Sequence, residues 1–422
     1  MKACVVILCA GADVGCDELD GLTPLQSAAM DSARELARSG RVGLVRSVPG
    51  GAMVGAGVCA LTLLGRDPNE ARVGEAVLVA LGSGVGIEPG EWVFVLDLVC
   101  VQREDECGGV GGERIRDAWV GELPDDEGKA LIGALMKHWS EQAPELVERM
   151  GYVHVGAGRA VVFDRSGMDW SSVETIDPGE LHDLSWGSAL PKGAWAEAKA
   201  LRTLTELGRE FLESCEINLA REEQGLRRAD LGWLWGQGRL GGRSTTWQTH
   251  GVGGAMICDS ALGSGIGSVL GLEPVLVERG DEASDAHHAR MGSRVVGSIR
   301  ANALTCVHAS APAHSSMRGD ALGKARALES IDRGIVKPAL EALRSSGEPW
   351  RMLIVPDRVH ASVHRRSVDA LVPFAMGGTD VVHVVERELS EIDGADSDLR
   401  VEHGDELLEF VLRSGLSGAR DA

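Results

Sequence analysis

The sequence predicts an α/β protein whose core is a mainly parallel β-sheet flanked by helices. Short runs rich in β-branched residues alternate with long helical patterns along the 422 residues, as expected for this class. The strand-like runs are hydrophobic almost without interruption, which is typical of strands covered on both faces. Hydrophobic residues make up 44% of the chain, enough for a full core, and the length predicts two or three domains.

Eight apolar runs of strand length support the sheet. The predicted strands span residues 4–8, 92–101, 160–163, 255–258, 274–278, 303–307, 351–355 and 371–376. Apolar residues spaced three and four apart predict helices over residues 126–149, 194–224 and 320–345, and such stripes indicate faces packed on a core.

Charged and glycine-rich stretches between these elements predict loops. Residues 102–114 and 278–290 are charged connectors, and we expect His287 and His288 in the second to be exposed to solvent. The glycine-rich run at 251–254 lacks the pattern of a phosphate-binding loop and is expected to form a turn.

Charge and cysteine usage exclude several classes of protein. The formal charge of −21 and a pI near 5.0 argue against binding to nucleic acid or to an anionic membrane surface. Nine cysteines without a C-x-x-C pair indicate neither a zinc finger nor a disulfide framework. No apolar run is long enough to span a bilayer. The apolar start is followed at once by Asp13, Asp17 and Glu18, so we expect a buried first strand and a cytoplasmic protein.

Residues 49–68, PGGAMVGAGVCALTLLGRDP, resemble an active-site loop in their small residues and their closing turn. Cys59 on this stretch is expected to behave as a small buried hydrophobe, and no other side chain before Thr62 can act as a nucleophile or bind a hard metal ion. The sequence therefore predicts a loop that lacks hydroxyl nucleophiles and metal ligands before Thr62.

Several motifs occur in an order that is informative: LDGLTPLQSA, GRVGLVRSVP, LLGRDP, HDL, WLWGQGR, HASAP followed by GD, ESIDRGIVKPAL, VPD and VPFAMGG. Over almost the whole chain this series resembles the archaeal-type cofactor-independent phosphoglycerate mutases of the alkaline phosphatase superfamily. The resemblance implies an alkaline-phosphatase-like core at residues 1–80 and 226–422, with a smaller inserted α/β cap domain at residues 81–225.

The resemblance also implies a chemistry. The family interconverts 3-phosphoglycerate and 2-phosphoglycerate through a phosphoserine and two Mn²⁺ or Mg²⁺ ions, which lower the pKa of the serine and absorb phosphoryl charge. Aspartate and histidine supply the metal ligands in such sites.

Most of those reactive positions are changed in this chain. The family's Gly-Ser-Asp is matched by Gly55, Ala56 and Gly57, so the nucleophile position is Ala56. The aspartate of its Pro-Asp-Gly is matched by Cys9. In its Asp-Glu-Ala-Gly-His the aspartate is matched by Ala313.

Further along the chain, the histidine of that last motif is matched by Met317. Its Pro-Asp-His is matched by Pro356, Asp357 and Arg358, and its later histidine by Ser367. Of the implied ligands only Asp357 is kept, and no bound metal cofactor is expected.

The resemblance carries four residues over as candidate substrate-binding groups: Arg159, His182, Asp183 and Arg358. Our leading hypothesis is a catalytically degenerate relative of the mutases that acts as a binding or regulatory protein. It would bind a phosphorylated small acid or another anion, or a protein partner, and neither nucleic acid nor a membrane.

The alternative hypothesis is an active mutase or related phosphoryl-transfer enzyme with a rebuilt metal site. Its candidate ligands are Asp357, His314, His360 and His364, and the last two would approach each other if their segment were helical.

A metal-free anion site is a third possibility. Arg318, Arg365 and Arg366 accompany Arg358 within or beside the matched motifs, and guanidinium groups bind phosphate or carboxylate directly. Cys9 is instead expected to behave as a small buried hydrophobe.

Overall fold

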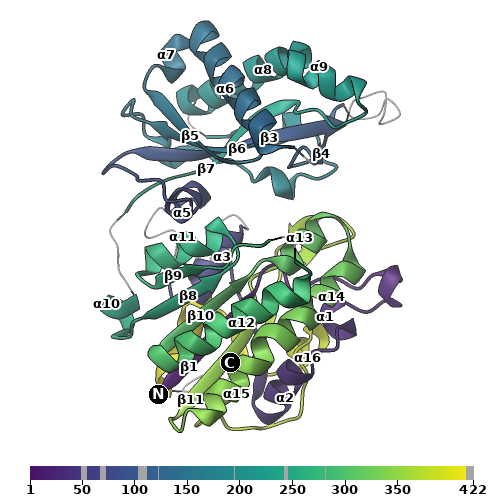
Figure 1. Ribbon diagram of the computed structural model, residues 1–422, viewed down its shortest axis with the longest axis vertical. Coiled ribbons are helices and arrows are strands. Elements are labelled where there is room, and N and C mark those ends of the chain that lie inside the picture. The colour runs from purple at the N-terminus through teal and green to yellow at the C-terminus, as the bar shows by residue number, and fades with distance from the viewer. Residues whose placement is uncertain are drawn as a thin grey trace. The chain divides into compact units, whose positions relative to one another are not determined.

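A computed structural model describes residues 1–48, 55–66, 73–102, 112–121, 123–193, 195–241, 246–280 and 282–414. The chain forms two compact units (Figure 1). Unit 1 comprises Met1–Ala71 and Gly242–Ala422, and unit 2 comprises Arg72–Gly241.

An eight-stranded sheet in the order β15-β2-β14-β11-β1-β10-β8-β9 forms the centre of unit 1. β1 is parallel to β10 and β11, and β8 is parallel to β10 and β9. β14 runs antiparallel to both of its neighbours, β11 and β2. The strands are β1 (Lys2–Leu8), β2 (Arg41–Val45), β8 (Gly254–Cys258), β9 (Glu273–Leu276), β10 (Leu304–Ala309), β11 (Trp350–Pro356), β14 (Val372–Gly378) and β15 (Arg400–Val401). This mainly parallel sheet with flanking helices confirms the predicted fold class.

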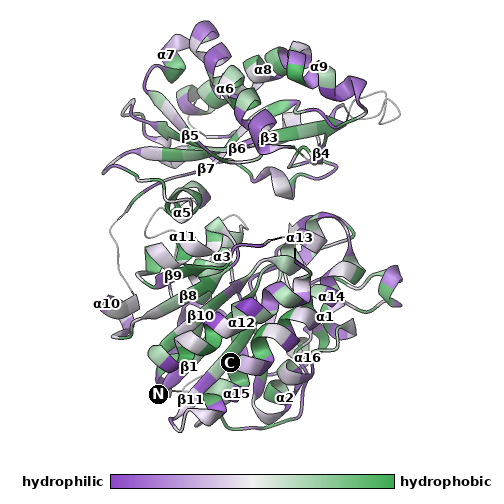
Figure 2. Ribbon diagram, in the orientation of Figure 1, coloured by the Kyte–Doolittle hydropathy of each residue, from purple (hydrophilic) through white to green (hydrophobic). Residues whose placement is uncertain are grey.

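Helices cover this sheet because alternate strand residues are apolar. Cys4, Val6 and Leu8 of β1 belong to one buried cluster with residues of α2, α12, α14 and α15. In Figure 2 the central strands are largely hydrophobic, whereas these helices carry both hydrophobic and hydrophilic residues. The longer helices of unit 1 are α2 (Asp31–Ser39), α3 (Ala56–Leu63), α11 (Ala261–Leu270), α12 (Ser284–Ala301), α13 (Ala311–Met317), α14 (Ala321–Ile331) and α15 (Lys337–Ser345).

The predicted helix at 320–345 has a one-turn interruption. α14 and α15 are joined by a π-helical turn, η5, at Asp332–Val336. A small hairpin of β12 (Val359–Ala361) and β13 (Arg366–Val368) follows β11.

Unit 2 is a five-stranded sheet whose described pairings are antiparallel. Its strands are β3 (Trp92–Gln102), β4 (Arg114–Asp117), β5 (Met150–Gly156), β6 (Arg159–Asp164) and β7 (Leu231–Arg239). Its longer helices are α5 (Glu75–Gly82), α6 (Asp125–Gln142), α8 (Trp195–Ser214) and α9 (Glu216–Glu223), with the short α7 (Pro144–Val147) after α6. Trp92, Phe94 and Leu96 share a buried cluster with Trp139 and Leu204, so α6 and α8 cover one face.

The division into units lies at different residues from the expected boundaries of 80/81 and 225/226. α5 contacts β3, β6 and β7, and β7 pairs with β3 over residues 231–239. Residues 73–80 and 226–241 therefore pack with unit 2. The predicted strand at 92–101 is β3, and it belongs to this antiparallel sheet.

The expectation that residues 278–290 form a loop with exposed histidines is wrong for its second half. α12 begins at Ser284, and His287 and His288 are each only 1% exposed. They lie on the helix face that packs inward, and His288 Nδ1 lies 2.7 Å from Ser330 Oγ. Most of the predicted loop at 102–114 lies outside the described residues.

In the part of the chain that the structure describes, no helix has the length and hydropathy needed to cross a bilayer. The eight described cysteines are buried thiols.

Candidate functional site

The candidate site lies at one edge of the unit 1 sheet. β1 ends at Leu8, β8 at Cys258, β10 at Ala309 and β11 at Pro356. Because these strands are parallel, their carboxyl ends share one edge, the usual place for a site in such sheets. The loops that follow them carry most of the positions singled out in the sequence.

A buried ion pair occupies the centre of this edge. Asp357 is 0% and Arg358 3% exposed, and Arg358 Nη1 donates to Asp357 Oδ2 at 2.7 Å. The other carboxylate oxygen accepts a hydrogen bond from the backbone N–H of Ala10 at 2.5 Å. Arg358 Nε donates to Ser367 Oγ at 3.2 Å. The guanidinium group of Arg358 thus connects the carboxylate of Asp357 with the hydroxyl of Ser367.

Cys9 and Ala313, which the resemblance matches to family aspartates, lie together in an apolar cluster. Cys9, Ala10 and Ala313 form a small buried group. Cys9 Sγ lies 3.1 Å from His308 Nε2. Burial, and then the charge of Asp357, raise the pKa of Cys9 well above its usual range, so the thiol is protonated at neutral pH and does not act as a thiolate.

Ala56, which the resemblance matches to the family's nucleophile, is the first residue of α3, directly after Gly55. The first hydroxyl further along that helix is Thr62, which is 2% exposed and donates to its own helix at Val58 O. Of the loop at 49–68, residues 49–54 and 67–68 lie outside the described residues.

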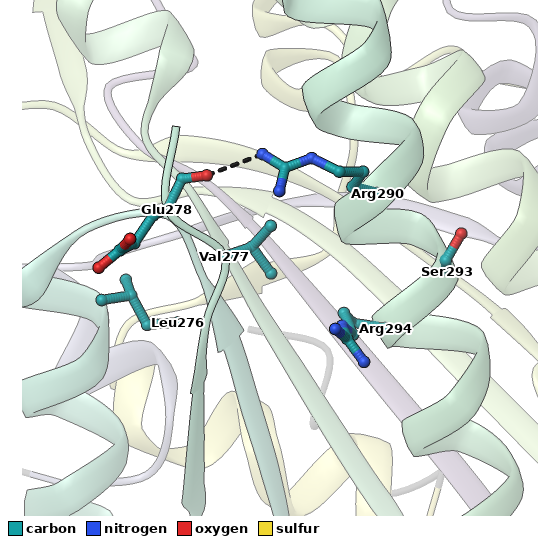
Figure 3. Close-up of a pocket in the computed structure, with 6 residues that line it drawn as sticks. All are labelled: Leu276, Val277, Glu278, Arg290, Ser293 and Arg294. Carbon is teal, nitrogen blue, oxygen red and sulfur yellow. Dashed lines mark hydrogen bonds between the residues drawn. The ribbon is translucent and has the colours of Figure 1, made fainter. Parts of the chain in front are cut away.

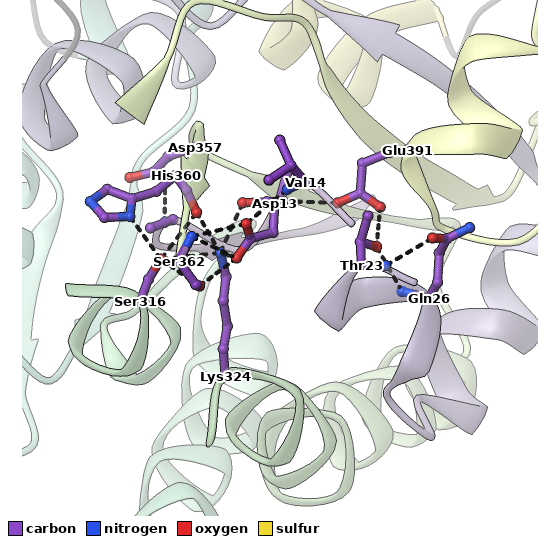
Figure 4. A network of polar contacts seen from close by, with 12 residues as sticks. Asp13, Val14, Thr23, Gln26, Ser316, Lys324, Asp357, His360, Ser362 and Glu391 are labelled. Carbon is purple, nitrogen blue, oxygen red and sulfur yellow. Dashed lines mark hydrogen bonds and ion pairs between the residues drawn. The ribbon is translucent and has the colours of Figure 1, made fainter. Parts of the chain in front are cut away.

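A buried polar network holds the neighbouring loops together (Figure 4). Lys324 is 0% exposed, and its ammonium group donates to Asp13 Oδ2 at 2.8 Å, to Ala12 O at 2.9 Å and to His360 O at 3.0 Å. Burial lowers the pKa of Lys324 to about 8 although Asp13 opposes the shift. Its three strong donors bind the loop after β1 to the hairpin after β11.

His360 belongs to the same network. Its Nδ1 lies 2.7 Å from Ser316 Oγ, and burial together with the charge of Arg358 lowers the pKa of His360 to about 2, so the imidazole is neutral. Its Nε2 is buried and has no hydrogen-bond partner among the described residues.

The four candidate ligands of a rebuilt metal site do not gather. His360 lies on β12, opposite Ser367 of β13. His364 is exposed in the turn between these strands, because the segment is a hairpin and not a helix. His314 is exposed on α13. Within the described ranges, no group of three or more His, Cys, Asp and Glu side chains could hold a metal ion.

The remaining candidates lie in unit 2. Arg159 makes a bidentate pair with Asp97, at 2.6 Å and 2.8 Å, and Trp235 Nε1 donates to the same carboxylate. Burial lowers the pKa of Arg159, but Asp97 outweighs that effect and the pKa lies above its usual value. His182 Nδ1 lies 3.0 Å from Arg116 O, and Asp183 O accepts a hydrogen bond from an arginine of β4.

Lys324, Asp13 and Asp259 were not predicted as site residues from the sequence. Asp259 follows β8 and accepts hydrogen bonds from the backbone N–H of Ser310, at 3.0 and 3.3 Å. Lys324 was placed within a helical stripe interpreted only as a core face. A lysine on the buried face of a predicted helix was the signal that could have found it, because a buried ammonium needs a carboxylate partner.

A pocket of about 430 Å³ beside β9 contains none of these residues. It is lined by Leu276–Glu278 and by Arg290, Ser293 and Arg294 of α12 (Figure 3). A second pocket of about 610 Å³ lies in unit 2, around Trp92 and Arg239.

Comparisons with known proteins point to one family. A family model described as 2,3-bisphosphoglycerate-independent phosphoglycerate mutase matches residues 37–218. The chain is 31% identical to 2,3-bisphosphoglycerate-independent phosphoglycerate mutase 2 of Methanothermobacter thermautotrophicus, covering 100% of this chain and 95% of the relative. It is 28% identical to the enzyme of the same name from Methanothrix thermoacetophila, covering 98% and 100%.

Two solved structures share the fold. The PH0037 protein from Pyrococcus horikoshii superposes with a TM-score of 0.70 at 18% identity, covering 97% of this chain and 96% of that one. Cofactor-independent phosphoglycerate mutase from Thermoplasma acidophilum gives a TM-score of 0.50 at 17% identity, covering 98% and 99%.

Proposed function

The chain belongs to the 2,3-bisphosphoglycerate-independent phosphoglycerate mutase family, and from this premise we propose that it is a member without the metal-assisted mutase activity. It would serve as a binding or regulatory protein for a phosphorylated small acid, in the cytoplasm. Fold and ancestry do not by themselves fix an activity, so the argument rests on the site.

The observation that carries the proposal is the position of Arg358. Its guanidinium group bonds Asp357 at 2.7 Å and Ser367 at 3.2 Å. Arg358 and Ser367 stand where the family motifs have histidines. A fixed cation bonded to the one kept carboxylate supplies charge balance there without a metal ion.

The surrounding residues do not fit two divalent cations. Hard and borderline cations require carboxylate oxygen and imidazole nitrogen, whereas Cys9, Ala10 and Ala313 form an apolar cluster. The neutral thiol of Cys9 adds no charge. With Ala56 at the nucleophile position, no phosphoserine can form there, and losing one essential nucleophile costs on the order of 10⁶ in turnover.

A binding role uses the groups that remain. In unit 1, Arg358 can donate paired hydrogen bonds to phosphate or carboxylate. Arg159, His182 and Asp183 are separate candidate contacts in unit 2. We propose 3-phosphoglycerate or a similar anion as the ligand.

An active enzyme with a rebuilt site is the second candidate function. It is favoured by the kept Asp357 and by His360 Nε2, which is buried without a hydrogen-bond partner among the described residues. It predicts Mn²⁺-dependent turnover that Asp357→Ala abolishes.

Turnover is the first test. The purified protein is assayed for conversion of 3-phosphoglycerate to 2-phosphoglycerate with Mn²⁺ and with Mg²⁺, beside an active relative as a positive control. We expect no turnover above that of the Asp357→Ala variant. Metal-dependent turnover that this variant lacks would overturn the proposal.

Ligand binding is tested by thermal shift, because a ligand that binds only the folded state raises the Tm by mass action. We expect 3-phosphoglycerate alone to raise the Tm, and Arg358→Gln to abolish the rise. A rise that requires Mn²⁺ would support the enzyme hypothesis. The absence of any shift, with or without Mn²⁺, would contradict a small anionic ligand.

A further inference from the structure

Three arginines meet at one corner of unit 1. Arg318 ends α13, while Arg365 and Arg366 lie at the end of the turn and the start of β13 in the hairpin. A side chain added at Gly319 would lie 2.8 Å from Arg365 Nε, so the Arg365 guanidinium packs over the residue next to Arg318. These three residues are called the arginine corner below.

None of the three guanidinium groups forms a hydrogen bond or an ion pair with any residue that the structure describes. The nearest carboxylates in the sequence are engaged elsewhere. Asp320 accepts a hydrogen bond from the backbone N–H of Gly323 at the start of α14, and Asp369 lies 3.7 Å from Arg46.

This lack of partners is unusual for the chain. Acidic residues outnumber basic ones by 63 to 42, and many arginines are paired, as in Arg159 with Asp97 and Arg165 with Glu91. A positive corner whose guanidinium groups pair with no described carboxylate, on a protein of charge −21, attracts anions locally while the rest of the surface repels them.

Exposed apolar residues lie close to the arginines along the chain. Val363 is 54%, Val368 39% and Leu322 44% exposed. The hairpin sheet contains only β12 and β13, so within the described residues the outer edge of β13 pairs with no strand. The hairpin thus presents backbone groups at the outer edge of β13, exposed apolar side chains and guanidinium groups to a partner.

We propose that the arginine corner is a docking site for an extended acidic segment of a protein partner. The segment would lie along β13, its carboxylates would pair with the guanidinium groups and its apolar residues would contact the valines. Duplex nucleic acid fits less well, because its affinity comes from many phosphate contacts and only three cations are gathered here.

The hairpin connects the arginine corner with the candidate site, because β13 carries both Arg366 and Ser367. Successive strand residues point to opposite faces, so Arg366 faces away from Ser367, whose hydroxyl accepts the hydrogen bond from Arg358. The docking proposal does not depend on the proposed loss of mutase activity, since it uses none of the groups of that site.

The test measures fluorescence anisotropy of a labelled peptide of alternating glutamate and valine with the full chain. We expect saturable binding that Arg365→Glu/Arg366→Glu weakens about tenfold or more, because reversed charges meet like charges. Arg365→Gln/Arg366→Gln should lie between the two. The matched control is Arg294→Glu, an exposed arginine of α12 that also lacks a described partner, and it should bind as the unaltered protein does.

Other outcomes decide against the proposal. Equal binding of a lysine–valine peptide, or an equal loss in Arg294→Glu, would show that the attraction is not specific to the corner. If duplex DNA or vesicles rich in phosphatidylserine bind more tightly than the peptide, and this binding depends on the corner, the ligand is not an acidic protein segment. Circular dichroism establishes that the variants fold; should the hairpin variants not fold, Arg318→Gln on α13 tests the same corner.

Discussion

Asp357 and Arg358 form a buried ion pair at the carboxyl edge of the unit 1 sheet. Both are buried, and each satisfies the charge of the other. The family resemblance indicated both residues, because they match its Pro-Asp-His motif. It could not indicate that Arg358 turns toward Ser367, because that contact depends on a hairpin whose short strands have no periodic signal.

Asp357→Ala should therefore destabilise the protein. It leaves a buried guanidinium group without a carboxylate, which costs about 3–5 kcal/mol when a buried pair is broken. Urea unfolding measures the loss. Asp357→Ala/Arg358→Met, which removes both charges, should recover much of the stability.

The exposed pair of Asp285 and Arg333, at 3.0 Å, provides the control. Asp285→Ala should change the free energy of unfolding by less than about 1 kcal/mol. Equal losses in the two alanine variants would mean that burial of the Asp357 pair contributes nothing.

His288 should make stability depend on pH. Burial lowers the pKa of His288 to about 4, below the value of about 6.5 in an unfolded chain. The unfolded state then binds more protons, so stability is complete above pH 6.5 and falls toward pH 4, by about 2 kcal/mol between pH 6.5 and pH 5. The difference in unfolding free energy between the protein and His288→Gln, followed across this range, isolates this contribution. A difference that stays constant with pH would contradict it.

At the scale of elements, the π-helical turn η5 brings Asp332 to the start of α2. Its carboxylate accepts hydrogen bonds from the backbone N–H groups of Ser32 at 3.0 Å and Ala33 at 2.9 Å. The sequence predicted a helix over 320–345, and the three- and four-residue spacing is indeed helical on either side. The spacing could not predict the π turn, because one extra residue in a turn leaves the apolar stripe almost unchanged.

Asp332→Ala removes both acceptors from the start of α2. Loss of such a cap should cost about 1–2 kcal/mol, measured as a lower midpoint of urea unfolding. Asp31→Ala at the first residue of the same helix is the control. Asp31 is 93% exposed and lies 4.0 Å from Arg34. It contributes through the helix dipole and this exposed pair, so that variant should lose only a few tenths of a kcal/mol.

The predicted strands are correct but incomplete. All eight predicted runs are strands, because continuous apolar runs follow from burial on both sides. The prediction missed β2, β4, β5, β7, β12, β13 and β15. The residues of β5 and β13 are mostly partly or fully exposed and lack that pattern, whereas β2 and β7 are largely buried but have glycines within their apolar runs. The prediction also could not give the direction of each strand. β14 runs antiparallel to β11, although its apolar run is like those of the parallel strands.

At the scale of the whole molecule, unit 2 is one continuous stretch and unit 1 is assembled from two. The family resemblance implied an insertion at residues 81–225. It could not include β7 in the inserted unit, because pairing with β3 is a contact between residues more than a hundred positions apart.

Unit 2 should fold on its own as residues 72–241, because it has its own buried cluster. We expect a cooperative thermal transition and resistance to proteolysis. The fragment 1–71 is the contrasting case and should remain unfolded, since the neighbours of β1 come from residues 304–309 and 350–356. A fragment 72–241 without a cooperative transition would mean that the two units depend on each other.

The central place of β1 has a consequence for synthesis in the cell. Its neighbours β10 and β11 are made long after it, at Leu304–Ala309 and Trp350–Pro356. At about 5–20 residues per second, the ribosome needs on the order of 15–60 s to reach them after β1 emerges. For that time a strand that is apolar from Ala3 to Leu8 is without a partner, while unit 2 is complete and able to fold. The nascent chain is therefore expected to need a chaperone at its N-terminus more than at any other point.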